Sequence, residues 1–394
     1  MKIHLLRKKE NFLEIFQNSI INFFQEKFPR SSYIKIKYII NDRLNIVYPS
    51  KIKRNDLAEL VSEFKYHPNF FQRFLQTIYV FVAIRWPLEI ITSSESIMIS
   101  VPNEVKKKWV FIPGNHSIRA IDLEKNSCFV FLKSGCSQNF IKSEMNIRFK
   151  NPWLKAPELI QKKNEWYEEQ RVVGLPWNRL SSAELKKKII ISAQYQLSIL
   201  YQKTTSRITI KEYVQNLHNS ILFKLENFFS ELPSKEKDII NSFIDKTEFL
   251  ISNSFGYKSI TLATTHGDFQ SGNLLCSKDD FWLIDWEYTN QRSIFYDALV
   301  FDLDSRFPLG LADRLKKKID DLNSIKNYLN WTGHVLETNE SYYFSIFFLE
   351  DLLLRLDENS TKNIKNKSKV MSTYLTQLLK IQNIITKNNM NYYE

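Results

Sequence analysis

Two short stretches decide the fold of this 394-residue chain: HGDFQSGN at residues 266–273 and LIDWE at residues 283–287. Asp268 and Asn273 stand five positions apart, and Asp285 follows twelve positions later, directly after the apolar letters FWLI, which read as a short buried strand. A carboxylate can orient a hydroxyl group and take its proton, while an amide oxygen and a second carboxylate hold Mg²⁺ against nucleotide phosphates. Mg²⁺ prefers oxygen ligands and keeps several waters, so two protein ligands suffice. These residue types at this spacing therefore favour metal-assisted phosphoryl transfer.

Both stretches resemble the catalytic core of the aminoglycoside phosphotransferase / choline kinase family, small-molecule kinases that share the protein-kinase fold. The family pattern is His-Gly-Asp, four residues, Asn, and then Ile-Asp-Trp/Phe-Glu, and every fixed position is met here. FYDAL at residues 295–299 also resembles the tyrosine-aspartate-leucine stretch that follows in the family. The alternative is a polar turn in which Asp268 and Asn273 only cap the backbone. That alternative leaves Asp285 at the end of its strand unexplained.

The resemblance implies an enzyme that transfers the terminal phosphoryl group of ATP to a hydroxyl of a small molecule, with Mg²⁺ as cofactor. It assigns Asp268 as the catalytic base, and Asn273 and Asp285 as the metal ligands. Gly267 stands where protein kinases have an arginine, and no Ala-Pro-Glu segment follows. Without that arginine the chain has no evident device for reading a phosphorylated activation loop. We therefore expect a small-molecule acceptor rather than a protein acceptor.

Three further residues are expected to support the catalytic ones. His266 is interpreted as a hydrogen-bonding residue of the catalytic loop and not as a proton carrier. Glu287 is left with two readings, a substrate contact or an outer-sphere metal ligand. Asp297 is expected to support the loop, because an aspartate that enters a helix caps its N-terminus well.

The strands of a kinase-like small lobe are expected upstream of these motifs. Alternating and apolar runs predict three of them, at residues 109–112, 118–123 and 128–133. Lys133 ends the third, where the protein-kinase fold keeps the lysine that grips the α/β-phosphates. A helix is expected within residues 137–149, and Glu144 inside it is the best candidate partner for Lys133. The alternative for both side chains is simple solvation at the surface.

Residues 166–176, WYEEQRVVGLP, resemble the strand, hinge and glycine that lead into the large lobe of the family. The resemblance places Glu169 and Arg171 among the nucleotide-binding residues, with the hinge backbone hydrogen-bonded to the adenine edge. A glutamate pair before a turn is also common on any surface strand. The turn at residues 113–117 holds a single glycine, so the sequence contains no visible glycine-rich phosphate flap.

The expected fold class is α+β: a two-lobed protein-kinase-like fold with a small antiparallel β lobe, a large mainly helical lobe and an N-terminal α/β extension. We divide the chain into an extension of unknown role (1–100), a small kinase-like lobe (101–175) and a large helical catalytic lobe (176–394). In the extension, the sequence predicts helices at 11–28 and 70–82 and strands at 33–40 and 44–47. In the large lobe, helical apolar periodicity marks residues 183–201, 210–229 and 341–356.

Composition is typical of a globular cytoplasmic protein. The 29 Phe, 18 Tyr and 8 Trp argue against disorder. The three cysteines, Cys128, Cys136 and Cys276, have neither metal-site spacing nor a secreted-style framework, which favours a reducing cytoplasm. The charged N-terminus is not expected to act as a signal peptide. Charges and a proline interrupt the most apolar stretch, residues 77–91, so no transmembrane segment is predicted.

The net charge of +12 comes partly from lysine clusters at residues 106–108, 186–188 and 316–318. Basic clusters can bind nucleic acid or an anionic membrane. Most such runs are solvated faces, so we do not expect nucleic-acid binding. We leave weak contact with an anionic membrane open.

Two functional hypotheses follow. The leading one is an ATP-dependent phosphotransferase that acts on choline, ethanolamine, another amino alcohol, a sugar or an aminoglycoside. The alternative is a catalytically silent kinase-fold protein that binds or scaffolds, and the intact set of Asp268, Asn273 and Asp285 argues against it. The sequence specifies neither the oligomeric state nor a choice between ATP and GTP. A cationic acceptor would need carboxylates or aromatic faces around Asp268, and the available acids are Asp302, Asp304, Glu350 and Asp351.

Overall fold

The computed structural model describes residues 2–66, 69–85, 92–105, 108–278, 280–320, 342–361 and 363–390. The chain forms two compact units, which we describe separately: Met1–Ile189 with Leu274–Glu287, and Ile190–Asn273 with Tyr288–Glu394. The first unit is built on an antiparallel sheet and the second is mainly helical, so the fold class is α+β, as predicted. Three features of the sequence lie partly outside the described residues: the apolar stretch at 77–91 (at 86–91), the lysine cluster at 106–108 (at 106–107) and the helix predicted at 341–356 (at 341).

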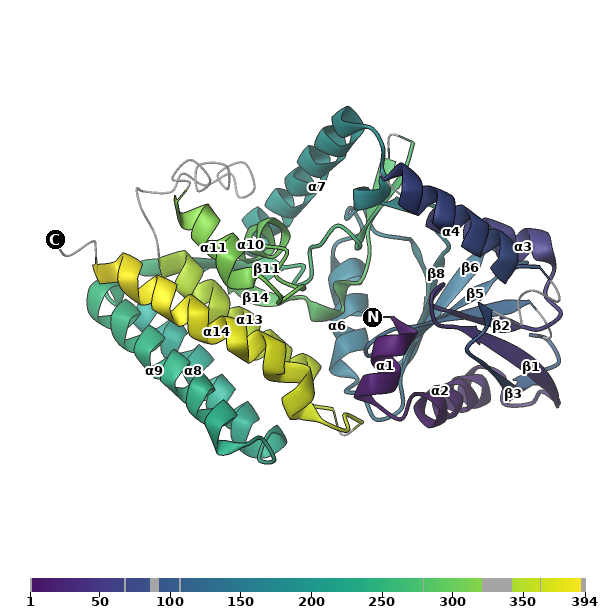
Figure 1. Cartoon of the computed structure of the whole chain (residues 1–394), viewed down its shortest axis with the longest axis horizontal. Helices are drawn as coiled ribbons and strands as arrows, with labels where there is room; N and C mark the ends of the chain where they lie inside the picture. The colour runs from purple at the N-terminus through teal and green to yellow at the C-terminus, as the bar shows by residue number, and fades with distance from the viewer. Residues whose placement is uncertain are drawn as a thin grey trace. The chain divides into compact units, whose positions relative to one another are not determined.

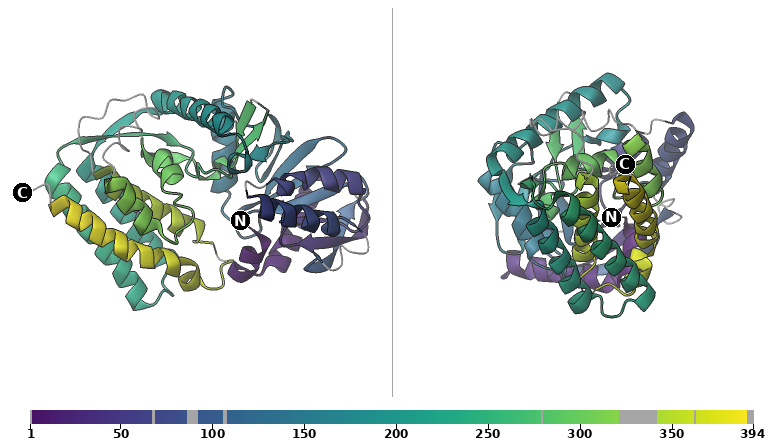
Figure 2. Two further views of the ribbon diagram at one scale, coloured as in Figure 1. Left: turned by 45° about the horizontal axis from the view of Figure 1, so that its top comes forward. Right: turned by 90° about the vertical axis from the view of Figure 1, so that its left-hand side faces the viewer.

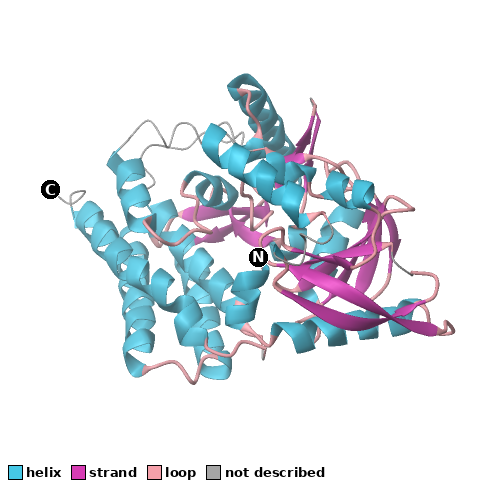
Figure 3. Ribbon diagram, turned by 45° about the vertical axis from the view of Figure 1, so that its right-hand side comes forward, coloured by secondary structure: helices cyan, strands magenta, loops and turns pink. Residues whose placement is uncertain are grey.

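The first unit is built on one eight-stranded antiparallel sheet, in the order β3-β1-β2-β4-β5-β6-β8-β7 (Figure 3). The three strands of the N-terminal extension join the strands of the predicted small lobe through β2 and β4, where Val47 pairs with Phe111. The extension is therefore part of the same sheet. The strands are β1 (Tyr33–Asn41), β2 (Ile46–Pro49), β3 (Glu95–Pro102), β4 (Trp109–Pro113), β5 (Ser117–Asp122), β6 (Ser127–Leu132), β7 (Leu159–Lys162) and β8 (Trp166–Gln170).

Helices cover both faces of this sheet (Figure 1). Because successive side chains of a strand point to opposite faces, Phe129 and Phe131 of β6 share a core with α2, whereas Cys128 and Val130 share one with α6. Phe131 stacks on Phe23 of α2 with ring centroids 4.3 Å apart. Burial of each such phenylalanine contributes about 1.5–3 kcal/mol. One face carries α1 (Ile3–Lys9) and α2 (Phe12–Lys27), and the other α3 (Arg54–Leu60), α4 (Phe70–Ala83) and α6 (Asn139–Lys150).

A three-stranded sheet in the first unit leads into the LIDWE stretch. Its order is β13-β12-β9, and the hairpin β12–β13 ends just before Asp285. Gly174 lies so close to β12 that a Cβ atom there would be 2.9 Å from the carbonyl oxygen of Cys276, so only glycine fits. The elements are β9 (Leu175–Pro176), β12 (Leu274–Ser277) and β13 (Asp280–Leu283), with 3-10 turns η1 (Ser62–Lys65), η2 (Trp177–Arg179) and η3 (Trp286–Tyr288).

The second unit packs its helices around α13, which is buried along almost its whole length. Most of its side chains are apolar, and its buried acids Glu350 and Asp351 have hydrogen-bond or ion-pair partners. Helix α8 packs against α9 and α13, and α14, drawn in yellow, lies along α9 (Figure 2). A small antiparallel sheet has the order β10-β11-β14, and the His266–Asp268 segment follows directly after β11. The elements are α7 (Ala183–Thr204), β10 (Ser206–Thr209), α8 (Ile210–Phe228), α9 (Ser234–Phe255), β11 (Ser259–Thr265), β14 (Asn290–Ser293), α10 (Tyr296–Asp302), α11 (Leu311–Asp320), α13 (Tyr342–Glu358) and α14 (Lys367–Met390).

The predicted elements within the described residues are present close to their predicted bounds. The helix expected at 11–28 is α2, the strands expected at 33–40 and 44–47 are β1 and β2, and the helix expected within 137–149 is α6. The division at residues 100 and 175 stays a prediction, because compactness alone divides the chain differently. Within the described part of the chain, every helix is too short or too polar to cross a bilayer.

Candidate functional site

The HGD segment forms a tight loop directly after β11. The backbone amides of His266 and Gly267 donate to the carboxylate of Asp297, at 2.7 and 2.9 Å. The hydroxyl of Tyr201 donates to the same carboxylate at 2.8 Å, and Asp297 is fully buried. Charge-assisted bonds to two adjacent amides fix the backbone that leads into Asp268. Asp297 thus contacts the loop that it was expected to support, although through the loop backbone and not by capping its own helix.

Gly267 is required by the shape of the loop. Its φ is +85°, in the left-handed region that other residues rarely adopt. A Cβ atom there would overlap the carbonyl oxygen of Tyr288 and come within 2.8 Å of Nη1 of Arg292. The arginine that protein kinases have at this position would not fit this backbone.

Asp268 is buried, and three side chains hold its carboxylate. Nε of Arg306 lies 2.9 Å from Oδ1, while Nε2 of Gln270 and Nδ2 of Asn273 each donate to Oδ2 at 2.9 Å. Arg306 also pairs with Glu358 at 2.9 Å. Burial alone would lower the pKa of Arg306, but Glu358 and Asp268 raise it well above its ordinary value. Arg306 therefore stays charged beside Asp268 and favours the ionised carboxylate.

Asn273 is oriented by Asp268. Its Nδ2 donates both to Oδ2 and to the backbone carbonyl of Asp268, each at 2.9 Å. Because both donor contacts use Nδ2, Oδ1 is left as the acceptor end of this amide. An amide oxygen of this kind suits a hard cation such as Mg²⁺.

Asp285 follows β13 in a strained turn. Its φ is +71°, a conformation that costs about 1–2 kcal/mol for a residue with a side chain. The turn is anchored by Trp286, which is fully buried and donates from Nε1 to the carbonyl of Leu283 at 3.0 Å. The Asp285 side chain keeps 26 % of its surface exposed, and its Oδ1 lies 3.3 Å from Nη2 of Arg119. The strain is offset by packing and leaves a partly exposed carboxylate at the end of the hairpin.

Arg119 of β5 links Asp285 to a chain of buried charges. Its Nε lies 4.0 Å from Glu169 of β8, and Glu169 accepts from Arg148 of α6 at 2.7 Å. Arg148 also pairs with Glu144 one helical turn away, at 3.3 Å. Burial alone would lower the pKa of Arg119, but Asp285 raises it well above its ordinary value. The guanidinium therefore stays charged.

Burial raises the pKa of Glu144 above its ordinary value. The pKa of Glu287 is raised further, by burial and by the neighbouring charges of Asp285 and Glu144. Both shifts favour the protonated, neutral form of these two carboxyl groups.

Lys133 does not pair with Glu144, so that expectation is wrong. Its Nζ forms an ion pair with Glu10, between α1 and α2, at 2.5 Å, and donates to the carbonyl of Gly114 at 3.3 Å. Both side chains are almost fully buried. Removing one partner of such a buried pair typically costs about 3–5 kcal/mol. The physical reason is strand alternation, because Lys133 stands two residues after Phe131 and points to the α2 face of the sheet.

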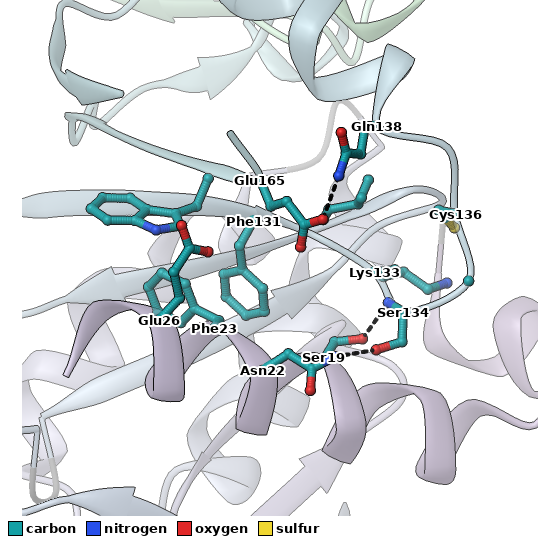
Figure 4. A pocket seen from close by; sticks show the side chains of 13 residues that line it. Ser19, Asn22, Phe23, Glu26, Phe131, Lys133, Ser134, Cys136, Gln138 and Glu165 are labelled. Carbon is teal, nitrogen blue, oxygen red and sulfur yellow. Dashed lines mark hydrogen bonds between the residues drawn. The ribbon is translucent and has the colours of Figure 1, made fainter. Parts of the chain in front are cut away.

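A cavity of about 270 Å³ lies beside Lys133, between α2 and the end of β6 (Figure 4). Ser19 of α2 accepts from the amide of Ser134 at 2.9 Å at its edge. Two acids, Glu26 and Glu165, also line the cavity. Carboxylates disfavour a phosphate, so this cavity does not suit the phosphates that Lys133 was predicted to grip.

The two predicted hinge residues pair with different helices. The Glu169 carboxylate contacts Arg148 of α6, as described above. Nη2 of Arg171 lies 3.2 Å from Glu59 of α3, and the Arg171 amide donates to the carbonyl of Asn126 at 3.3 Å. Their nucleotide-binding role stays a prediction.

Two of the four acids considered for a cationic acceptor are used inside the second unit. Glu350 accepts from the amide and hydroxyl of Ser293, at 2.6 and 2.7 Å, and from the hydroxyl of Tyr213. Asp351 pairs with Arg355 at 2.9 Å. Both acids are buried, so they hold α13 in place and do not present a charge to an acceptor.

Several residues that contact the predicted site residues were not predicted from the sequence, among them Glu10, Arg119 and Arg306. The sequence does contain a signal for Arg119, because it is a charged residue between apolar neighbours in a strand that was predicted to be buried. Glu10 and Arg306 carry no local signal. They are distant in sequence from Lys133 and Asp268, the residues that they contact.

No protein-family model matches the chain, and no curated protein is significantly similar to it in sequence. Solved structures that it resembles include a choline kinase from Cryptosporidium parvum Iowa II, with 14 % identity, 72 % of this chain and 90 % of that chain covered, and a TM-score of 0.46. An ethanolamine kinase from Plasmodium vivax has 14 % identity, with 84 % and 94 % covered and a TM-score of 0.47. An aminoglycoside phosphotransferase from Streptomyces rimosus has 12 % identity, with 64 % and 93 % covered and a TM-score of 0.39.

These are the groups that the sequence motifs resemble. At such identities and TM-scores, the roles of individual residues have to come from the chain's own contacts.

Proposed function

We propose that the protein is an ATP-dependent phosphotransferase whose acceptor is a hydroxyl group of a small molecule. The observation that carries the proposal is the environment of Asp268. Its carboxylate is buried, paired with Arg306 and hydrogen-bonded to Asn273, on a loop whose backbone is pinned by Asp297. A polar turn that merely capped itself would need none of these contacts.

In this proposal Asp268 orients the acceptor hydroxyl and takes its proton. Arg306 places a positive charge beside the carboxylate, and the fixed loop holds it in one position. Positioning of this kind lowers the entropy cost of bringing the two reactants together. His266 and Asp297 support the loop through its backbone.

Asn273 and Asp285 are the proposed Mg²⁺ ligands. The fit rests on their donor atoms, because the Asn273 contacts with Asp268 use Nδ2 and leave its amide oxygen as the acceptor end, and Asp285 has a partly exposed carboxylate in a strained turn. Among the described residues, no three His, Cys, Asp or Glu side chains converge as a metal site. A bound Mg²⁺ would thus complete its shell with phosphate oxygens and water, and would neutralise phosphate charge.

The test compares two variants that the proposal separates. Asp268→Asn keeps the shape and loses the base, so turnover should fall about 10²–10⁴-fold while Mg-ATP affinity changes little. Asn273→Ala should weaken Mg²⁺-dependent ATP binding as well as turnover. Gln270→Ala is the matched control, because it removes a hydrogen bond to the same carboxylate but no proposed base or ligand.

Turnover is followed as ATP consumption with a panel of amino alcohols, sugars and aminoglycosides, and affinity by calorimetry with and without Mg²⁺. Equal ATP affinities and equal residual rates in Asp268→Asn and Asn273→Ala would contradict the division of roles. ATP-dependent stabilisation of the wild type without turnover on any acceptor would favour a silent scaffold instead.

A further inference from the structure

We propose that Arg119 of β5, and not Lys133, is the cation that contacts the nucleotide phosphates. The inference rests on the proposed function and names a residue that performs part of it. Lys133 was expected in this role from the resemblance to the kinase fold, whereas Arg119 is proposed here because of its position on the sheet.

The two cations lie on opposite faces of the eight-stranded sheet. Arg119 is paired directly with Val130 across β5 and β6, and directly opposed residues share a face. Val130 belongs to the core formed with α6, so Arg119 lies on the α6 face. Lys133 follows Phe131 by two positions, and Phe131 belongs to the core formed with α2. Asp285, the proposed metal ligand, contacts the cation on the α6 face.

The two cations also differ in what they are bound to. Lys133 keeps only 3 % of its side-chain surface exposed and is held by Glu10 and the carbonyl of Gly114. To reach a phosphate it would have to abandon a buried carboxylate. Arg119 keeps 22 % of its side-chain surface exposed, and its contacts with Asp285 and Glu169 are long, at 3.3 and 4.0 Å. Its Nη1 makes no hydrogen bond with the described residues, so it has a donor to offer.

Both terminal nitrogens of Arg148, the other arginine of this cluster, are already bonded to protein oxygens. It is almost fully buried and donates to Glu144, Glu169 and the carbonyl of Pro157. Through Glu169 it connects α6 to Arg119, where the fold was expected to use a direct lysine–glutamate pair. A planar guanidinium can hold Asp285 with one edge and two phosphate oxygens with another, which an ammonium group cannot do as well.

The experiment measures the affinities of ATP, ADP and adenosine by calorimetry, with Mg²⁺ and again with EDTA. Arg119→Gln should lower ATP and ADP affinity about 10–100-fold, in both conditions, as expected for a lost charge-assisted contact. Adenosine affinity should stay within roughly twofold, since adenosine has no phosphate. Arg119→Lys keeps the positive charge but not the two-pronged guanidinium geometry, so its ATP affinity should fall about three- to tenfold.

The matched control neutralises the other cation together with its partner. The double variant Glu10→Gln, Lys133→Met leaves no lone buried charge, and it should bind all three ligands as the wild type does. Adenosine binding reports that each variant is folded at the site.

Three outcomes overturn some part of the account. Wild-type ATP affinity in Arg119→Gln, or a loss of ATP affinity confined to the double variant, would overturn the inference alone. A parallel loss of ATP and adenosine affinity in Arg119→Gln would mean that Arg119 only shapes the fold, and would also overturn it. A wild type that binds neither ATP nor ADP would overturn the proposed function itself.

Discussion

The carboxylate of Asp297 is predicted to fix the backbone of the loop that follows β11, and Asp297→Ala tests this directly. In the native loop it receives the amides of His266 and Gly267 and the hydroxyl of Tyr201. A hydrogen bond to a charged group contributes about 1.5–3 kcal/mol. In Asp297→Ala, the free energy of opening each amide should therefore fall by that amount, which corresponds to hydrogen exchange about 10–150-fold faster.

The assay is amide hydrogen exchange, read by mass spectrometry on peptides that contain His266 and Gly267. Tyr201→Phe is the control, because it removes one donor and leaves both amide contacts in place. It should change exchange at the two amides by less than about tenfold. Unchanged protection of these amides in Asp297→Ala, in a protein that is otherwise folded, would refute the role given to Asp297.

Three shorter predictions concern the metal, the loop and the thiols. Asp285→Asn should weaken Mg²⁺-dependent ATP binding and abolish turnover, because it removes the charge that anchors the ion; unchanged affinity in a Mg²⁺ titration would exclude Asp285 from the metal site. Gly267→Ala should destabilise the protein by at least about 2 kcal/mol, since it combines a left-handed φ with overlap at Tyr288, and thermal unfolding measures this. Burial raises the pKa of the Cys136 thiol to about 11, so the neutral thiol dominates at neutral pH and the reactive thiolate increases as pH rises. Alkylation of Cys136 should be roughly 100-fold slower in the folded than in the unfolded protein near pH 8, and should accelerate about tenfold per pH unit; a rate that levels off below pH 9 would contradict the shift.

Local patterns were enough to predict the strands and helices near the motifs. The apolar run before Asp285 is β13, and the three strands around Lys133 are β4, β5 and β6. These elements depend on the period of apolar residues and on turn chemistry, which are written within about ten residues. β3 and α14 were not among the predicted elements.

Long-range pairings were not predictable in the same way. Lys133 was assigned to Glu144 by its place in the fold, yet it pairs with Glu10, which is 123 positions away. Strand alternation combined with the pairing register of β5 and β6 puts Lys133 and Arg119 on opposite faces, and alternation within each strand alone does not specify this. The contact between Arg306 and Asp268 could not be predicted, because nothing near Arg306 in the sequence indicates which carboxylate it contacts.

The central claim is transfer of a phosphoryl group to a hydroxyl with Asp268 as base, and one measurement tests it most directly. Wild-type protein and Asp268→Asn are incubated with Mg²⁺, ATP labelled in its terminal phosphoryl group and a panel of amino alcohols, sugars and aminoglycosides. The account predicts label in at least one acceptor with the wild type, and a yield lower by about 10²–10⁴-fold with Asp268→Asn at equal ATP occupancy. Equal transfer by the two proteins, or ATP binding without transfer to any acceptor, would contradict it.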